Sequence, residues 1–210
     1  MRQFLNPQIH AAAVDADLVL LDVNADAYLC LPGAAESWNG GAGAKALLDD
    51  LVEKGLATRS PAPEPAPSVL ELPRIDLRNG QRRQPTAADL LHLAGAWLDL
   101  ALHYRGRSLS HILAAVRRRQ SSPREASDIA ELQRLCQVFA TAVVWLPAPG
   151  KCLVRSFLLI RFLQRAGQDA RWVFGVRTWP FQAHCWVQSG DAALEDAPER
   201  LFAYTPILAV

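Results

Sequence analysis

The sequence predicts an α+β protein in two parts, a small N-terminal module and a larger C-terminal domain. Apolar residues recur at helical spacing from residue 86 to about residue 166, and the period then changes to two. The N-terminal part instead begins with strand-like runs and ends with helical ones. Helices and strands that are segregated along the chain in this way are typical of α+β folds rather than of alternating βαβ units.

Composition and charge exclude several classes of protein. Half of the 210 residues are hydrophobic and 20% are charged, which is typical of a globular chain and not of a disordered or collagen-like one. With 22 Lys and Arg against 21 Asp and Glu, the net charge of +1 gives no electrostatic case for nucleic acid. The longest near-apolar stretch, Val138–Ala148, is far shorter than the ~20 residues of a membrane span.

The N-terminus and the cysteines predict a cytoplasmic setting. Residues Met1–Pro7 have no long apolar core behind their single Arg, so no secretory signal is expected. The four cysteines contain no C-x-x-C pair and are too few for a disulfide framework in a chain of this length. The sequence also has no cluster with metal-ligand spacing, so no metal is expected.

The first 59 residues predict a small sheet followed by helices. Three apolar runs of strand length are Ile9–Val14, Asp17–Val23 and Ala27–Leu31. Turn residues between the second and third runs predict a hairpin. Helical spacing then predicts a short helix near Ala34–Trp38 and a longer one over Ala44–Lys54. A module of about 55 residues barely sustains a core of its own, so we expect it to bind a ligand rather than to catalyse a reaction.

A proline-rich segment divides the chain. Ser60–Ser68 alternates proline with small residues, and proline has no N–H for a β-ladder or a helix interior. Such a segment adopts the extended polyproline II conformation and acts as a semi-rigid spacer. We therefore divide the chain into a module at residues 1–59, a linker at 60–73 and a larger domain at 74–210.

The larger domain begins with three predicted helices. Thr86 and Asp89 have the spacing of a capping box at the start of the first helix. Ser108 is the predicted N-cap of the second helix. A further capping box with proline at the first helical position, Ser122–Glu125, precedes the third helix, which we expect to extend to about Val144.

A fourth helix and an antiparallel sheet follow. The fourth helix is predicted over Cys152–Gly167, and period-two runs at Ala170–Val176 and Gln182–Gln188 predict two strands. A turn at Ser189–Asp191 then leads into a returning strand at Ala192–Asp196.

Cys152 is the strongest candidate for chemistry because it stands at the predicted start of a helix. Unpaired N–H groups and the helix dipole stabilise a thiolate there, and a thiolate is the nucleophile of covalent acyl transfer. The same N–H groups are suited to hold an oxyanion. His184, on a strand of the following sheet, completes a papain-like pairing of cysteine and histidine. The alternative is structural: a buried thiol and an ordinary core or surface histidine.

Two neighbours of this pair have predicted roles. Cys185 directly follows His184, and side chains alternate along a strand, so we expect Cys185 to point to the opposite face as a core residue. Arg155 lies one turn after Cys152, where it either supports the thiolate or is simply a solvated helix residue.

A carboxylate should orient His184, and the hairpin offers two. A three-residue turn at Ser189–Asp191 places position 184 opposite Asp196, and directly opposed residues share a face of the sheet. A two-residue turn at 189–190 places Glu195 there instead. Three-residue hairpin loops are common, so we favour Asp196 and keep Glu195 as the alternative.

Two short motifs around Cys152 and His184 resemble motifs of the B proteins of lasso-peptide biosynthesis. Those proteins are leader peptidases with a transglutaminase-like core. Gly150–Ser156 contains the Cys-L-x-R-S stretch of that family, and Ala183–Val187 carries its histidine. The resemblance covers roughly residues 80–210. It implies that the catalytic residues are Cys152, His184 and Asp196.

The N-terminal module resembles the PqqD-like recognition domain of the same systems, a winged-helix fold of three strands and three helices. In that family the leader peptide adds as a strand beside the third strand and packs against the third helix. The corresponding elements here are Ala27–Leu31 and Ala44–Lys54. The residues that the resemblance places at the leader are Tyr28, Leu29, Cys30, Leu31, Leu48, Leu51 and Val52.

The resemblance implies a cytoplasmic cysteine peptidase that removes the leader of a lasso-peptide precursor before macrolactam formation. It also implies two partners, the precursor peptide and an ATP-dependent macrolactam synthetase. No nucleotide motif is found, so we expect no cofactor in this chain and assign any ATP requirement to the partner. The alternatives are an amide-forming acyltransferase, which resolves the same thioester with an amine, and a non-catalytic adaptor that only binds the leader.

Overall fold

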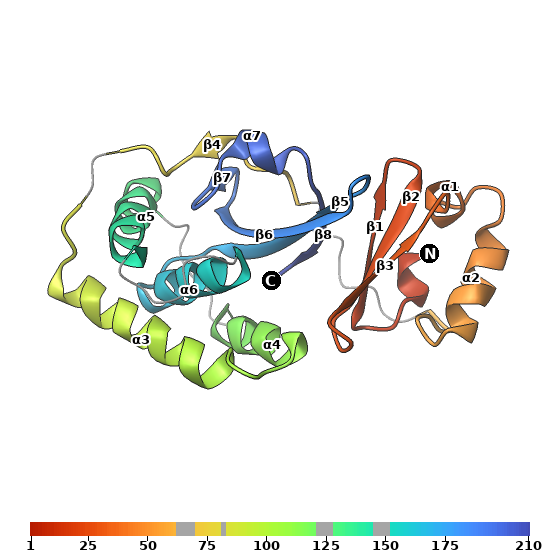
Figure 1. The fold of residues 1–210 in the computed structure, drawn as a ribbon, viewed down its shortest axis with the longest axis horizontal. Helices are drawn as coiled ribbons and strands as arrows, with labels where there is room; N and C mark the ends of the chain where they lie inside the picture. Colours follow the sequence, from red (N-terminus) through yellow and green to blue (C-terminus); the bar gives the residue numbers. More distant parts are fainter. Residues whose placement is uncertain (62–69, 81–82, 121–127, 145–151) are drawn as a thin grey trace. The chain divides into compact units, whose positions relative to one another are not determined.

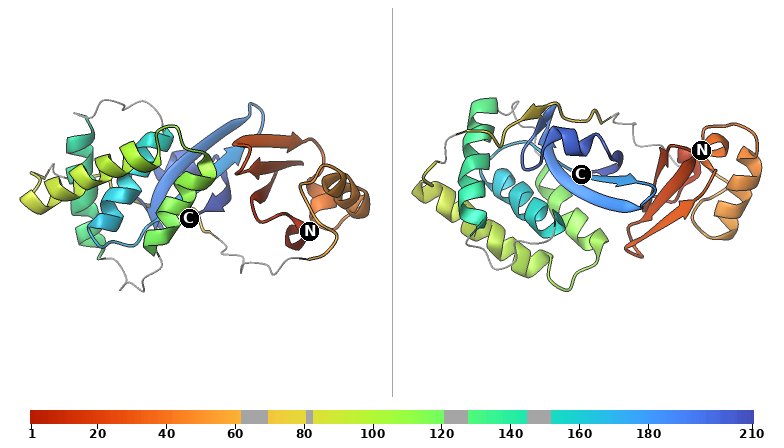
Figure 2. Two further views of the ribbon diagram at one scale, coloured as in Figure 1. Left: turned by 90° about the horizontal axis from the view of Figure 1, so that it is seen from below. Right: turned by 45° about the horizontal axis from the view of Figure 1, so that its top comes forward.

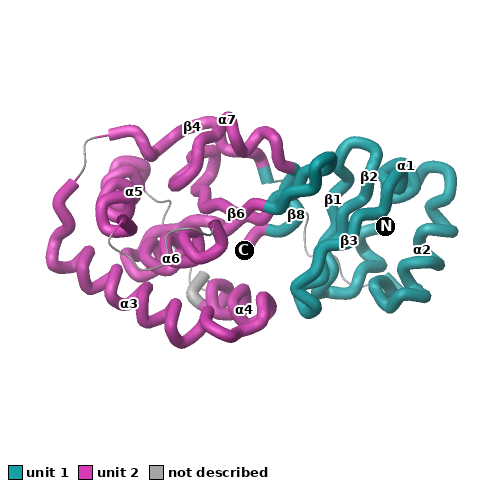
Figure 3. Tube along the Cα trace, viewed as in Figure 1, with its two compact units in different colours: residues 1–70, 175–183, 205–208 teal, residues 71–174, 184–204, 209–210 magenta. Residues whose placement is uncertain are grey.

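The structure, a computed structural model, describes residues 1–61, 70–80, 83–120, 128–144 and 152–210 (Figure 1). The chain forms two compact units (Figure 3). The segments of unit 1 are 1–70, 175–183 and 205–208, and those of unit 2 are 71–174, 184–204 and 209–210. Most of the predicted proline-rich spacer lies outside the described residues.

Unit 1 contains the predicted three-stranded antiparallel sheet. Its strands follow one another in the order β1 (Ile9–Val14), β2 (Asp17–Asp22) and β3 (Ala27–Leu31). Two helices come next, α1 (Ala35–Trp38) and α2 (Ala44–Glu53). Within residues 1–61 these two are the only α-helices, whereas the PqqD-like resemblance implied three. A single turn of 3-10 helix precedes the sheet instead.

The core of unit 1 lies between one face of this sheet and the two helices. Leu18 and Leu20 of β2, Trp38 of α1 and Leu51 of α2 belong to one buried cluster. Leu51 is completely buried. Because β3 pairs only with β2 among the described residues, its other edge carries backbone groups that a further strand can pair with.

Unit 2 is built around helix α6. The helices of unit 2 up to this point are α3 (Ala87–His103), α4 (Leu109–Gln120), α5 (Ile129–Val143) and α6 (Cys152–Arg165). The predicted capping box at the start of α3 is confirmed, because Thr86 and Asp89 bond to each other's backbone N–H groups. Helix α6 contacts α3, α4 and α5, and Phe157 and Leu159 on it are completely buried. Figure 2 shows α6 among the other three helices from two further directions.

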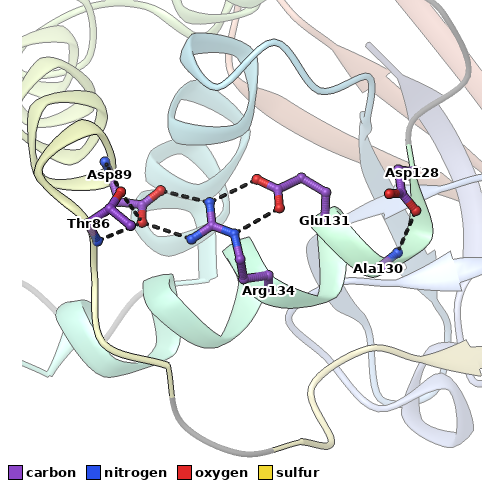
Figure 4. Close-up of polar contacts among 6 residues, drawn as sticks. All are labelled: Thr86, Asp89, Asp128, Ala130, Glu131 and Arg134. Carbon is purple, nitrogen blue, oxygen red and sulfur yellow. Dashed lines mark hydrogen bonds and ion pairs between the residues drawn. The ribbon is translucent and has the colours of Figure 1, made fainter.

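Helix α5 begins later than the sequence predicted. Its N-cap is Asp128, whose side chain accepts a hydrogen bond from Ala130 N–H (Figure 4). The expected capping box at Ser122–Glu125 lies outside the described residues.

Within the described residues, the second sheet has five strands in the order β4-β7-β6-β5-β8. Their bounds are β4 (Ile75–Asp76), β5 (Arg171–Arg177), β6 (Gln182–Ser189), β7 (Ala192–Ala193) and β8 (Thr205–Ala209), and a short helix, α7 (Pro198–Leu201), precedes β8. Strands β4 and β8 were not predicted. Strand β8 contains Pro206, and a proline normally argues against a strand in the sequence. Proline is tolerated here because β8 is an edge strand.

Candidate active site

Cys152 is the first residue of α6, and its side chain is exposed. Helix α6 is therefore oriented with the positive end of its dipole at this sulfur, where it stabilises a thiolate. The preceding loop, residues 145–151, lies outside the described part of the chain. The sequence prediction that a helix starts at Cys152 is confirmed.

His184 on β6 connects Cys152 to a carboxylate. His184 Nε2 lies 2.6 Å from Asp196 Oδ2, and the side chains are 16% and 11% exposed. The histidine side chain is also hydrogen-bonded to Cys152. Because Asp196 occupies Nε2, the nitrogen left for Cys152 is Nδ1. The structure thus brings together the three residues that the sequence singled out.

Asp196 is itself held in place. Its Oδ1 accepts hydrogen bonds from Ala197 N–H at 2.8 Å and from Arg200 at 3.3 Å, which leaves Oδ2 facing the histidine. Burial favours the neutral acid, but the hydrogen bonds from His184 and Ala197 outweigh it and lower the pKa of Asp196. Asp196 is therefore a carboxylate at neutral pH.

The electrostatics of the cysteine and histidine favour an ion pair. Hydrogen bonds from Cys185 and His184 lower the pKa of the Cys152 thiol to about 4, against the cost of partial burial. Hydrogen bonds to Asp196 and Cys152 raise the pKa of His184 to about 9. Between these two values the pair is a thiolate and an imidazolium, which is the reactive form of a catalytic cysteine.

The hairpin that positions Asp196 differs from both predicted turns. In the β6–β7 ladder, Ser189 pairs with Ala192, so the turn consists of Gly190 and Asp191. Gly190 has φ +56° and Asp191 does not have positive φ, which is the pattern of a type II′ hairpin. Regular pairing would not place Asp196 opposite His184. Asp196 reaches the histidine because β7 ends at Ala193 and residues 194–196 bend.

Glu195, the alternative carboxylate, has a different environment. Burial raises the pKa of Glu195 to about 8, although nearby Arg155 opposes the shift. Arg155 Nε lies 3.5 Å from Glu195 Oε2, and within the described residues neither glutamate oxygen has a hydrogen-bond partner. Glu195 therefore does not orient His184. Arg155, predicted as possible support for Cys152, is paired with this neighbouring carboxyl group instead.

The prediction that Cys185 points away from the site is wrong. Cys185 is buried, as expected, with 5% of its surface exposed. However, its thiol and its backbone N–H are both hydrogen-bonded to Cys152. Alternation along β6 fixes the direction of Cys185 relative to His184, but it does not determine where α6 places its first sulfur atom.

Sequence reasoning also missed the residues that support this arrangement. Ser156 is completely buried one turn after Cys152, donates to the Cys152 carbonyl at 2.7 Å and accepts from Trp172 Nε1 at 2.8 Å. The ring centroids of Trp186 and Tyr204 lie 6.2 and 5.3 Å from the centroid of the His184 ring. Ser156 was visible in the sequence only as part of a motif, with no indication of its role.

Comparison with known proteins places the chain in a family. Residues 94–209, more than half of the chain, match the profile described as the transglutaminase-like superfamily. The chain belongs to the transglutaminase-like superfamily. The matched range includes Cys152, His184 and Asp196.

A curated relative matches a shorter segment of the chain. The microcin J25-processing protein McjB of Escherichia coli is 47% identical over 47 residues, which is 22% of this chain and 23% of that protein. The match thus spans about a quarter of the relative's length. No solved structure matches the chain.

The predicted leader-binding residues occupy different environments in unit 1. On β3, Leu29 is 40% exposed, while Tyr28, Cys30 and Leu31 are half-buried. Leu31, Leu48 and Val52 pack against the same core cluster. Leu51 is completely buried in that core, so the prediction that it faces the leader is wrong. Its place on the α2 stripe looked the same in the sequence as that of its half-buried neighbours Leu48 and Val52.

Two other kinds of feature are absent from the described ranges. No group of three or more His, Cys, Asp or Glu that could hold a metal ion is present in them. No helix in them has the length and apolar character needed to cross a bilayer.

Proposed function

We propose that this transglutaminase-like protein is a cysteine peptidase that removes the leader of a lasso-peptide precursor. One observation carries the proposal: an exposed thiol at a helix start is hydrogen-bonded to a histidine that a buried aspartate holds by its other nitrogen. The resemblance of the Cys152 and His184 motifs to lasso-peptide B proteins supports the substrate class. The partial match to a protein named for processing microcin J25 agrees with it.

The geometry suits acyl transfer in two steps, acylation of Cys152 and hydrolysis of the thioester. The Cys152 thiolate attacks the scissile carbonyl carbon, and His184, as imidazolium, then gives its proton to the leaving amine. Neutral His184 next takes a proton from water, which attacks the thioester carbonyl and releases the acid and the thiolate. Asp196 keeps the imidazole ring oriented throughout and stabilises its positive charge.

Unit 1 is the proposed recognition element for the leader. The open edge of β3 offers main-chain hydrogen bonds to an added strand. Leu29, exposed on that strand, and the half-buried Leu48 and Val52 of α2 offer apolar contacts for its side chains. A leader held here raises the local concentration of the scissile bond, so the active site itself needs little affinity.

The proposed pathway places two partners beside this chain. The precursor is the substrate, and an ATP-dependent macrolactam synthetase consumes the liberated core. Since cleavage by a thiolate needs no nucleotide, any ATP requirement belongs to the synthetase.

Mass analysis of the precursor after incubation with the full chain tests the proposed reaction. Two fragments whose masses sum to that of the precursor plus one water support it, provided that Cys152→Ala yields neither. A product in which the carboxyl side is joined to an amine would overturn hydrolysis in favour of the amide-forming alternative. An unchanged precursor that stays bound would favour the adaptor.

A pair of variants tests the recognition element in the full chain. Leu29→Asp should weaken leader binding about tenfold or more without unfolding unit 1, because it places a charge against an apolar side chain of the leader at an exposed position. Ala27→Asp, at an exposed position on the same strand, is the control that separates a local effect from general charge repulsion. Fluorescence anisotropy with a labelled leader peptide measures binding, and unchanged affinity for Leu29→Asp would exclude β3 as the docking edge.

A further inference from the structure

Two thiols meet at the start of α6. Cys152 is exposed there, while Cys185 is buried on β6 directly beside it. The Cys185 thiol and backbone N–H both hydrogen-bond to the Cys152 side chain. Cys185 helps to lower the pKa of Cys152, but acyl transfer uses only one sulfur atom, so the chemistry of the second thiol is left unassigned.

Ser156 fixes the second thiol in this position. Cys185 Sγ lies 3.3 Å from Ser156 Oγ, and the same hydroxyl group is tied to the Cys152 carbonyl and to Trp172 Nε1. Ser156 and Trp172 are both completely buried. The hydroxyl group therefore anchors both cysteines, and Cys185 cannot turn away without losing its polar contacts.

We infer that Cys152 and Cys185 form a peroxide-sensitive dithiol. A hydroperoxide oxidises Cys152 to a sulfenic acid, and Cys185 then closes a disulfide that blocks the site reversibly. The exposed residue reacts with the oxidant and the buried residue resolves the product, which protects Cys152 from irreversible oxidation.

The two steps balance with hydrogen peroxide as oxidant. The Cys152 thiolate attacks one peroxide oxygen, the O–O bond breaks, and the leaving hydroxide takes the proton of imidazolium His184 to form water. The Cys185 sulfur then attacks the Cys152 sulfur and the S–O bond breaks. The departing hydroxide takes the Cys185 proton, which gives a second water, a disulfide and neutral His184.

The charge on Cys152 also orders the two steps. While Cys152 is a thiolate, the hydrogen bond to it, followed by burial and charge repulsion, raises the pKa of Cys185 well above that of a free thiol. A sulfenic acid is neutral, so its formation removes the contribution of the negative charge. Cys185 is thus inert before oxidation and more acidic after it.

The experiment treats the full chain with hydrogen peroxide, alkylates the remaining thiols and digests with trypsin. Cleavage after Lys151, Arg155, Arg177 and Arg200 puts the two cysteines on separate peptides, 152–155 and 178–200. We expect mass spectrometry to find these peptides joined by a disulfide that dithiothreitol removes. The readout does not depend on peptide cleavage, so it stands or fails separately from the proposed function.

Variants of the second thiol make the test specific. In Cys185→Ala the disulfide should be absent, and sulfinic acid at Cys152 should accumulate at least about tenfold faster than in the unmodified chain. Cys136→Ala, which removes a buried thiol of α5, is the control and should behave like the unmodified chain. Cys185→Ser serves if the alanine variant fails to fold.

Two results would overturn the inference. One is sulfinic acid at Cys152 in the unmodified chain as fast as in the Cys185 variants. The other is a disulfide that joins Cys152 to Cys30 or Cys136 instead of Cys185.

Discussion

Two regions of unit 2 each bury an aspartate that is hydrogen-bonded to a cation, but only one of them can do chemistry. In the helical layer, Asp89 of α3 accepts two hydrogen bonds from Arg134 of α5, at 2.8 and 2.9 Å (Figure 4). At the start of α6, Asp196 accepts one from His184 at 2.6 Å. The hydrogen bond from Arg134 lowers the pKa of Asp89, and that from His184 outweighs burial to lower the pKa of Asp196.

The two regions differ in whether the cation can transfer a proton. Arg134 does not release a proton in proteins, and two further N–H groups of its guanidinium bond to Glu131, so the network is closed. His184 can give up and regain a proton, with a pKa of about 9, and its second nitrogen faces an exposed thiol. A shifted carboxylate pKa alone therefore does not identify a functional site. A carboxylate whose partner is titratable and also contacts an exposed nucleophile does identify one.

The largest effect should follow from removal of that nucleophile. Cys152→Ala should abolish cleavage, because no other thiol is both exposed and paired with His184 within the described residues. Leader affinity should stay within about twofold, since the proposed binding edge belongs to unit 1. Fragment masses and leader anisotropy measure the two properties, and residual cleavage above about a thousandth of the original rate would contradict the assignment.

The two adjacent carboxyl groups should differ strongly. Asp196→Asn should slow cleavage by about 10²-fold or more, because the amide can hold His184 in the wrong tautomer and cannot stabilise its charge. Glu195→Gln should change the rate little, since Glu195 is not hydrogen-bonded to the histidine within the described residues. Single-turnover kinetics compare the variants, and the reverse order of effects would assign the orienting role to Glu195.

The closed network should affect stability rather than chemistry. Asp89→Asn should lower the free energy of unfolding by about 2 kcal/mol, as it weakens both the capping box and the charged hydrogen bonds to Arg134. Asp50→Asn, which breaks an exposed ion pair with Lys54, is the control and should cost only about 0.5 kcal/mol. Urea denaturation followed by tryptophan fluorescence gives both values.

The same network predicts a pH dependence. The pKa of Asp89 is lower in the folded chain than in the unfolded one, so its stabilisation is complete above the unfolded value, about 4, and is lost as the pH falls below it. Asp89→Asn should therefore reduce the acid sensitivity of unfolding. An identical fall in stability below pH 4 for both proteins would mean that other groups cause it.

The parts of the fold that depend on neighbouring residues could be predicted from the sequence. The capping box at Thr86 and the helix start at Cys152 are local signals, and both are confirmed. The strands of unit 1 were likewise visible as apolar runs.

The details that depend on tertiary packing could not be predicted. Asp196 was favoured on the basis of a three-residue turn, but it reaches His184 through a bend after a two-residue turn. A Gly-Asp pair at 190–191 was the signal for that turn, although the sequence cannot show the bend. The contact between Cys185 and Cys152 depends on how α6 packs against β6, which no spacing within one strand determines.

The pH profile of Cys152 alkylation tests the central claim, that the start of α6 holds a thiolate and an imidazolium. With iodoacetamide and peptide mass spectrometry, the rate at Cys152 should be nearly constant from about pH 5 to pH 8 and fall as the pH drops through about 4. In Asp196→Asn the fall should move to higher pH, because the imidazolium is less stable. A rate that simply rises through pH 8 to 9, as for an isolated thiol, would contradict the account.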